Sequence, residues 1–215
     1  YAARLRHAGA HHTPRRAFCG VHVITGGLGG VGLRAAAVLA EGGASVVLSS
    51  RSGRISNGGL LSLHELLVLP TVATDVGDED DARSLLCSCS LVLTGVLHAA
   101  GVLRDKLIRS VAADDLSCAW GAKARAASHL CLSSFHVPLR GCQAYSSWVS
   151  TFGSVGQANY AACNTVRTGP APYAVLCKCG NIECFRHRMS HLDVMACSGF
   201  VAWPEDVCAS SCELD

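Results

Sequence analysis

The chain has 215 residues, of which 50% are hydrophobic and 16% are charged, and its formal net charge at pH 7 is +2. This composition excludes a disordered chain, and so small a charge, without a basic block, gives no indication of nucleic-acid binding. No apolar run is long enough to span a membrane, and the first residues show no signal-peptide pattern. We therefore expect a polar lead-in over residues 1–17, one folded domain over 18–168 and a divergent tail over 169–215.

Residues 21–32, VHVITGGLGGVG, change from a β-branched run into glycines and then into a helix-forming sequence over 33–41. This pattern predicts a strand, a tight turn and a helix. Glycines allow a ligand to approach the backbone closely, and the first N–H groups of a helix bind phosphate oxygens. An ordinary glycine-rich turn is the alternative, but the position between strand and helix favours the pyrophosphate of a dinucleotide.

A second strand is predicted over residues 44–51, and it ends in Ser50 and Arg51. A site for NAD usually has an acidic residue roughly 20 residues after the glycines, where it binds the ribose 2′-hydroxyl. Here no acid is present, and Arg51 is suited to pair with a 2′-phosphate. A solvated surface arginine is the alternative. The pattern favours NADP(H).

Further strands are predicted over residues 71–76, 91–97 and 143–147, and helices over 60–69, 79–87 and 112–132. The alternation predicts an α/β fold, a Rossmann-like doubly wound parallel sheet with helices on both faces. Ligands bind such sheets at the carboxyl ends of the strands. We therefore expect the residues at those ends to gather at one edge.

The thirteen cysteines are odd in number and irregularly spaced, which argues against a complete disulfide framework. Free thiols suit a reducing intracellular compartment such as the cytoplasm. Cys87, Cys118, Cys131 and Cys163 are expected to be small buried residues. The cysteines and histidines between residues 177 and 191 fit no standard zinc-finger spacing, so no metal site is predicted.

Four residues form a candidate catalytic set. Tyr160 and Asn164 share one face of a predicted helix, Ser147 ends the strand before it, and Lys123 lies in the preceding long helix. Reduction of a carbonyl leaves an alkoxide that needs a proton donor, and a tyrosine serves if a nearby cation stabilises its phenolate. A buried structural tyrosine and a solvated lysine are the alternatives for each residue alone.

Residues 20–165 resemble the ketoreductase domain of modular polyketide synthases and animal-type fatty-acid synthases, in the short-chain dehydrogenase/reductase superfamily. The matching segments, in the family's order, are HVITGGLGGVG, VLSSRSG, TDVGD, GVLHAAGVLRDKLI, WGAKARAASHL and YSSWVSTFGSVGQANYAACN. By position, the resemblance implies that Ser147 and Tyr160 are the catalytic serine and tyrosine. Asn164 stands where ordinary members of the superfamily have lysine, and Lys123 matches the relocated lysine of the ketoreductases.

The cofactor site follows from the glycine turn, the strand ends and the resemblance together. Asp75 and Val76 are expected at the adenine, and the small residues of the HAAG segment along the cofactor. The complete expected set is Thr25, Gly27, Leu28, Gly30, Gly32, Ser50, Arg51, Asp75, Val76, Ala99, Ala100 and Gly101.

The resemblance implies NADPH-dependent reduction of a β-ketoacyl thioester to the β-hydroxyacyl form, in polyketide or fatty-acid synthesis. The implied partners are an acyl carrier protein, whose phosphopantetheine holds the substrate, and other synthase domains, with no nucleic acid and no membrane. Leu103, Arg104 and Asp105 partly match the leucine-aspartate-aspartate signature of one ketoreductase type, and Phe152 stands where the opposite type has tryptophan.

The resemblance ends after Thr165, where Gly169 and the prolines at 170 and 172 are expected to stop the helix and where we expect the next strand and the substrate lid to be missing. The chain then has the character of a fragment of a larger synthase. Two alternatives remain: an inactive nucleotide-binding remnant or scaffold, and a stand-alone short-chain dehydrogenase. Asn164 disfavours the second of these.

Overall fold

The computed structural model describes residues 19–54, 69–89, 93–135, 137, 139–147, 149–165 and 174–179. In this part of the chain, six parallel strands form one sheet in the order β3-β2-β1-β4-β5-β6. The strands are β1 (Val21–Thr25), β2 (Ser45–Ser50), β3 (Thr71–Ala73), β4 (Leu93–His98), β5 (Gly141–Ser147) and β6 (Ala174–Cys179). The strand order reverses between β1 and β4, which confirms the predicted doubly wound, Rossmann-like sheet.

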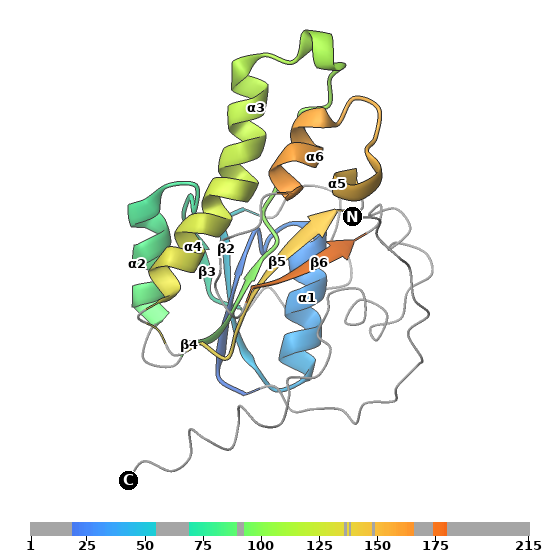
Figure 1. Ribbon diagram of the computed structural model, residues 1–215. Coiled ribbons are helices and arrows are strands. Elements are labelled where there is room, and N and C mark those ends of the chain that lie inside the picture. Colours follow the sequence, from blue (N-terminus) through green and yellow to red (C-terminus); the bar gives the residue numbers. More distant parts are fainter. Residues whose placement is uncertain are drawn as a thin grey trace, which may run out of the picture.

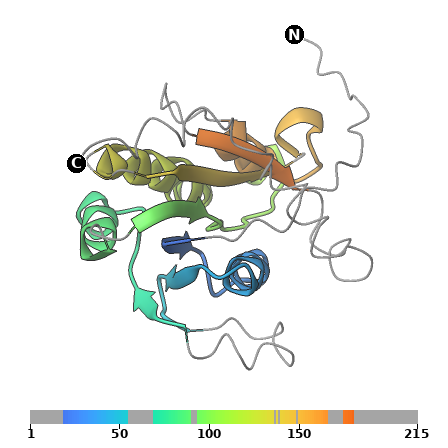
Figure 2. The same ribbon diagram turned by 90° about the horizontal axis from the view of Figure 1, so that it is seen from below.

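Helices cover both faces of the sheet, as Figures 1 and 2 show. Helix α1 (Gly30–Glu41) lies on one face, and α2 (Glu79–Cys89) and α4 (Ala126–Ser134) lie on the other. The short helices α5 (Val149–Phe152) and α6 (Ala158–Thr165) stand beyond the carboxyl ends of the strands, beside α3 (Ala113–Trp120). A 3-10 turn, η2 (Ile108–Ser110), precedes α3.

Alternate residues of each strand supply the two halves of the core. In β1, Ile24 packs toward α1 while Val23 packs toward α2 and α4. In β4, Leu97 and Val96 divide in the same way. Neighbouring side chains of a strand point to opposite faces, so a sheet with helices on both faces needs apolar residues at consecutive positions. The continuous apolar runs in the sequence have this cause.

Helices α3 and α4 belong to one continuous helix, joined by the π-helical stretch η3 (Gly121–Arg125). The backbone keeps right-handed helical angles through Trp120, Gly121, Arg125 and Ala126. This confirms the long helix predicted over residues 112–132. The π-helical stretch was not predicted, and it contains Lys123.

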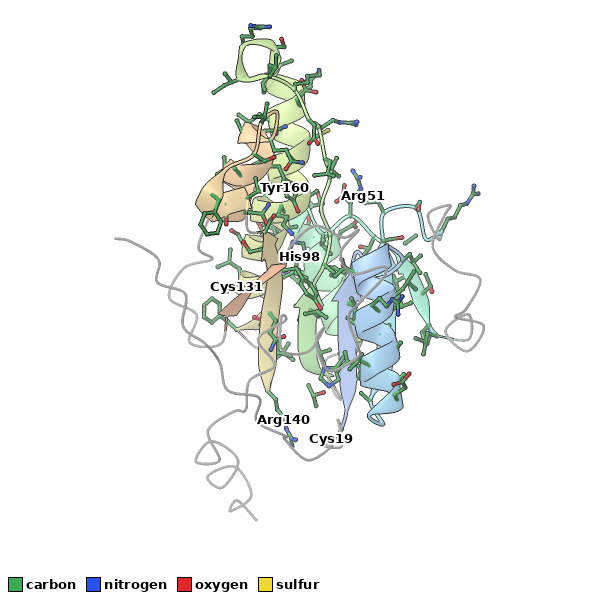
Figure 3. The ribbon with its side chains drawn as sticks, turned by 90° about the vertical axis from the view of Figure 1, so that its right-hand side faces the viewer. Cys19, Arg51, His98, Cys131, Arg140 and Tyr160 are labelled. Carbon is green, nitrogen blue, oxygen red and sulfur yellow. The ribbon has the colours of Figure 1, made fainter. Side chains whose placement is uncertain are left out.

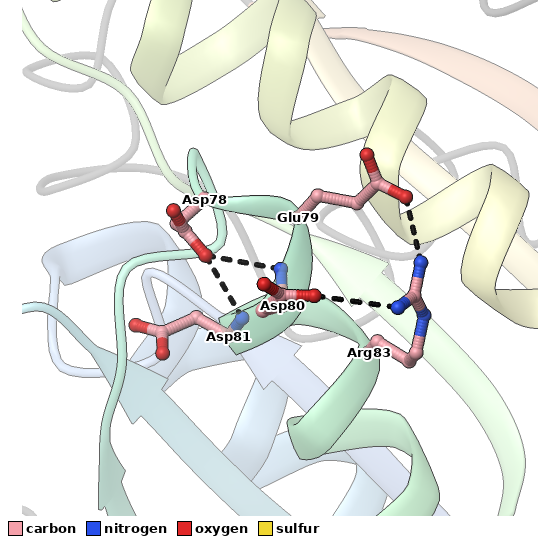
Figure 4. Close-up of polar contacts among 5 residues, drawn as sticks. All are labelled: Asp78, Glu79, Asp80, Asp81 and Arg83. Carbon is pink, nitrogen blue, oxygen red and sulfur yellow. Dashed lines mark hydrogen bonds and ion pairs between the residues drawn. The ribbon is translucent and has the colours of Figure 1, made fainter.

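Helix α2 begins at an acidic cap (Figure 4). Asp78 Oδ1 accepts hydrogen bonds from the backbone N–H groups of Asp80 (3.0 Å) and Asp81 (3.1 Å). Arg83 donates to Glu79 at 2.7 Å and to Asp80 at 3.3 Å on the exposed side of the first turn. Acids near a helix N-terminus also complement its dipole. The predicted start of this helix at Glu79 is confirmed.

The expectation that the strand after the tyrosine helix is missing is wrong. Strand β6 pairs in parallel with β5 over residues 174–179, and so extends the sheet by one strand. The prolines that we expected to stop the preceding helix lie before this strand, at 170 and 172, and leave six residues free to pair. Residues 60–68 of the predicted helix over 60–69, and most of the predicted tail, lie outside the described residues.

The burial predicted for four cysteines is right for Cys163 and wrong for Cys87 and Cys118, which are exposed, whereas Cys131 is half-buried. Cys87 follows the buried pair Leu85–Leu86 on α2, where the turn of the helix takes it to the solvent side. No helix in the described ranges is both long and apolar enough to cross a membrane.

The turn after β1 packs tightly against the segment after β4. Gly26 has a φ of +68°, and a Cβ added there would lie 2.5 Å from both the Cα and the N of Ala100. At Gly30, by contrast, a Cβ would meet nothing within 4 Å in the described structure. The two glycines therefore serve different purposes, since only Gly26 is required by the protein's own packing.

We predict that Gly26→Ala lowers the free energy of unfolding by at least about 2 kcal/mol, because left-handed backbone strain adds to a clash with Ala100. Gly30→Ala should change it by less than about 1 kcal/mol, because the added methyl has space. Urea unfolding of the two variants beside the parent chain measures both. Equal losses of stability would contradict this account of the turn.

Candidate active site

The first turn of α1 is the place where we expected a phosphate site. Its N-cap is Gly29, no side chain caps it, and no acid lies in its first turn. Gly30 is exposed there, and the space beside its Cα is open. Uncapped N–H groups and the positive end of the helix dipole suit an anion.

Several expected cofactor residues act through packing. A Cβ at Gly32 would lie 2.5 Å from the oxygen of Gly26, and one at Gly27 would lie 2.7 Å from the oxygen of Ile24. Leu28 and Val76 have their side chains in the two halves of the core, next to α1 and α2. The side chains of Leu28 and Val76 therefore support the site from the core of the protein.

The expected adenosine end lies at the carboxyl ends of β2 and β3. Arg51 directly follows β2 and is exposed, and Ser50 Oγ accepts a hydrogen bond from Gly53 N at 3.1 Å. Asp75 Oδ1 accepts a hydrogen bond from Gly77 N at 3.0 Å. Figure 3 shows Arg51 and Tyr160 at the same end of the sheet, opposite Cys19 and Arg140. The structure thus brings these candidates to one edge, as expected.

The HAAG segment connects the cofactor turn with the candidate lysine. Ala99 N donates to the oxygen of Thr25 at 2.8 Å, and Ala100 lies against Gly26. A Cβ at Gly101 would lie 3.5 Å from Cδ and 3.8 Å from Nζ of Lys123. Small residues here allow two backbones and a long side chain to meet.

Lys123 is buried, with 7% of its surface exposed. Its Nζ donates to the carbonyl oxygen of Tyr145 on β5 at 2.6 Å. A buried ammonium is costly unless it is hydrogen-bonded, and this bond satisfies one of its three donors. The ammonium therefore lies at the end of β5, two residues before Ser147.

Helix α6, which carries Tyr160 and Asn164, contacts η3, the stretch that carries Lys123. Tyr160 packs against Ala119, Ala124 and Cys163, where small side chains let α6 approach the long helix. Burial raises the pKa of the Cys163 thiol to about 11, and the positive charge of Lys123 opposes that rise. Helix α6 also contacts β5, the strand that ends in Ser147.

Two polar groups complete the site. Asn164 donates from Nδ2 to the main-chain carbonyl oxygen of Tyr160 at 2.8 Å. Within the described structure, the buried Oδ1 of Asn164 has no hydrogen-bond partner. Ser147, buried at the end of β5, accepts a hydrogen bond from Val149 N at 3.3 Å. Lys123, Ser147, Tyr160 and Asn164 come from η3, β5 and α6, and their elements meet at one place.

Comparison with known proteins now identifies the family. A model of the KR domain family matches residues 20–175, most of the chain. The chain is a ketoreductase domain. It belongs to the ketoreductase domains of modular polyketide synthases, within the short-chain dehydrogenase/reductase superfamily.

Among curated proteins, polyketide synthase GfsA of Streptomyces halstedii is 39% identical over 153 residues, which are 67% of this chain and 2% of that protein. A mycocerosic acid synthase-like polyketide synthase of Mycobacterium tuberculosis is 36% identical over 157 residues, which are 68% of this chain and 7% of that protein. The chain therefore spans a small part of the curated relatives that it matches.

Solved structures agree with this family. A structure of A-type ketoreductases from a modular polyketide synthase has a TM-score of 0.64 and 34% identity, covering 75% of this chain and 36% of that one. A ketoreductase domain from the bacillaene assembly line has a TM-score of 0.65 and 30% identity, and the match covers 74% of this chain and 40% of that one. Both belong to the class of domain that the motifs indicate.

The ketoreductase domain also contains a tether that we did not predict from its sequence. Asn159 Nδ2 donates to the oxygen of Arg104 at 2.8 Å, and Gln157 Nε2 donates to Asp105 Oδ2 at 2.9 Å. Lys106 N donates to the oxygen of Gly156 at 2.8 Å. These bonds join the loop after β4 to the start of α6. The signature-like residues 103–105 thus lie beside the helix of Tyr160.

Lys106 also holds the base of that loop. Its Nζ forms an ion pair with Asp115 Oδ2 at 2.7 Å, and the same carboxylate oxygen accepts the N–H of Ala112 at 3.0 Å. Both bonds favour the ionised carboxylate, so they lower the pKa of Asp115, the bond from Lys106 most. The loop is fixed at the start of α3 as well as at α6.

His98, the first residue of HAAG, was expected at the carboxyl edge but with no role for its side chain, and it lies at the centre of this end of the sheet (Figure 3). Its Nδ1 lies 2.7 Å from Thr25 Oγ1, and its Nε2 lies 3.1 Å from the carbonyl oxygen of Lys123. Burial, reinforced by the charge of Lys123, lowers the pKa of His98 from 6.5 to about 3. The ring is therefore neutral at physiological pH. The sequence signal that could have indicated a role for His98 is its position directly before a run of small residues.

Stability should depend on pH through His98. Above pH 6.5 the ring is neutral in both folded and unfolded chains, but below that value only the unfolded chain binds the proton, so the free energy of unfolding falls as the pH decreases from 6.5 toward 3. At pH 5 the loss from this ring is about 2 kcal/mol. Urea unfolding at pH 7.5 and pH 5 should show a smaller loss in His98→Gln than in the parent chain. The same loss in both would contradict the burial of a neutral ring.

Proposed function

We propose that the chain reduces a β-ketoacyl thioester to the β-hydroxyacyl form with NADPH. The observation that carries this proposal is that η3, β5 and α6, the elements that hold Lys123, Ser147, Tyr160 and Asn164, come together at the edge of the sheet where α1 begins. A phosphate-binding turn and a set of proton-donating groups at one edge suit a carbonyl reduction.

The described residues fit the dinucleotide. The start of α1 offers N–H groups to a pyrophosphate, and Gly30 leaves space beside them. Arg51, exposed after β2 where no acid is present, suits a ribose 2′-phosphate. Ala99, Ala100 and Gly101 keep the floor of the site free of large side chains. When bound, NADPH supplies the hydride.

Each member of the catalytic set has a role that follows from its place. Ser147 and Tyr160 are proposed to hydrogen-bond the β-carbonyl oxygen, and Tyr160 gives its proton to the alkoxide that forms there. Lys123 then stabilises the resulting phenolate, from a position where the Tyr145 carbonyl holds its ammonium. The buried Oδ1 of Asn164 can accept a hydrogen bond from Lys123 or from water, and so complete the proton path.

The proposed partner is an acyl carrier protein that presents the substrate on its phosphopantetheine arm, together with other domains of a polyketide synthase. The great length of the curated relatives supports this, since the chain spans 2% to 7% of those compared above. A role in fatty-acid synthesis is the related alternative. The domain limits that we propose remain 18–168 for the cofactor-binding domain and 169–215 for the tail, although β6 lies in the latter.

We predict that Tyr160→Phe lowers the turnover number by about 10² to 10⁴, because it removes the proton donor and little else. The assay is NADPH oxidation at 340 nm with an N-acetylcysteamine β-ketoacyl thioester, and the control is an unchanged NADPH dissociation constant. A folded parent chain that binds NADPH without turnover would favour the inactive remnant instead.

Arg51→Ala should weaken NADPH binding by about 10- to 100-fold, the effect of a charge-assisted hydrogen bond to the phosphate, and should change NADH binding little. Fluorescence titration of both nucleotides measures the ratio. Arg54→Ala, at an exposed arginine three residues along the chain, is the matched control for a general loss of positive charge. Equal weakening of NADPH and NADH by Arg51→Ala would refute the 2′-phosphate site.

A further inference from the structure

We propose that His98 is a positioning residue that holds the π-helical stretch η3 in place and thereby fixes Lys123 at the catalytic site. This inference rests on the catalytic role proposed for Lys123. His98 is the buried last residue of β4, and its ring reaches the long helix at the carbonyl of Lys123.

The hydrogen bonds of His98 determine its tautomer. The carbonyl oxygen of Lys123 can only accept, so Nε2 must carry the proton and donate it across the 3.1 Å contact. In a neutral ring Nδ1 is then an acceptor, and Thr25 Oγ1 donates to it at 2.7 Å. The carbonyl of Lys123 thus selects the tautomer, and the hydroxyl of Thr25, which can donate or accept, is compatible with it.

The hydrogen bond from His98 is important because the carbonyl that accepts it lies within the π-helical stretch η3. Short π-helical stretches are rare within α-helices, and they persist where the surroundings favour them. In η3 the N–H of Ala126 reaches back to the oxygens of both Gly121 and Lys123. His98 supplies the carbonyl of Lys123 with a further donor from outside the helix. The sheet thus contributes directly to the backbone geometry of η3.

Lys123 is consequently held at both ends. His98 binds its backbone oxygen from β4, and the Tyr145 carbonyl on β5 binds its Nζ at 2.6 Å. If the π-helical stretch relaxed to a regular α-helix, the register would shift by one residue, which turns a side chain by about 100° around the helix axis. Such a shift would move the ammonium away from Tyr145 and α6.

Two substitutions separate the two hydrogen bonds of the ring. The amide of glutamine reaches about as far as Nε2, so His98→Gln keeps a donor for the Lys123 carbonyl. The amide of asparagine reaches only as far as Nδ1, so His98→Asn keeps a partner for Thr25 and loses the bond to Lys123. Both replace a buried ring by a smaller polar side chain and so provide a matched pair.

In the full chain, His98→Asn should lower the turnover number by at least about tenfold, whereas His98→Gln should stay within about threefold of the parent. The alkaline limb of the pH–rate profile should move to higher pH in His98→Asn only, because a phenol without a nearby ammonium keeps its proton longer. A purely structural defect would lower activity without moving that limb. Equal turnover numbers and pH profiles in the two variants would overturn the proposal.

A second measurement does not depend on activity. Hydrogen exchange of the backbone amides over residues 121–130 should become faster in His98→Asn than in His98→Gln, while the amides of α1 stay unchanged in both. Unchanged exchange over 121–130 in both variants would also overturn the proposal. If the parent chain shows no turnover, the proposed function fails, and exchange alone decides whether His98 holds η3.

Discussion

The buried ammonium of Lys123 is the charge around which this end of the molecule is assembled. Desolvating it is costly unless hydrogen bonds compensate, and the 2.6 Å bond to the Tyr145 carbonyl requires the long helix to meet the end of β5. Gly101 and the small residues beside Tyr160 allow that approach. Ser147, Tyr160 and the lysine therefore come together as a consequence of satisfying one charge.

The two halves of the sheet carry different groups of candidate residues at their carboxyl ends. Strands β1 to β3 end in the glycine turn, Arg51 and Asp75, which suit a dinucleotide, and strands β4 and β5 lead to the groups that suit a proton transfer. The halves meet where β1 pairs with β4, and there the contacts are close. Gly26 touches Ala100, and His98 joins Thr25 to the backbone of Lys123. The glycine turn and the backbone of Lys123 are thus joined through Thr25 and His98.

Predictions from the sequence succeeded where a local pattern decides the outcome. The β-branched run at 21–24, the glycines after it and the acids at the start of α2 each predict their element, because propensity and capping act over a few residues. They failed where the direction of a helix face or a distant partner decides the outcome. Cys87 and Cys118 are exposed because of the direction in which their helices turn, and β6 forms because β5 offers it a free edge.

The sequence by itself determined the class of fold, the order of its elements and the family. Apolar periodicity, the glycine turn and the spacing of serine and tyrosine can all be recognised without the structure. Only the tertiary structure decided how the site is held. The π-helical stretch, the tautomer of His98 and the tether from Asn159 and Gln157 to the loop after β4 depend on partners 25 to 55 positions away. No local pattern encodes such bonds, because each donor is defined only once the sheet has brought its acceptor within reach.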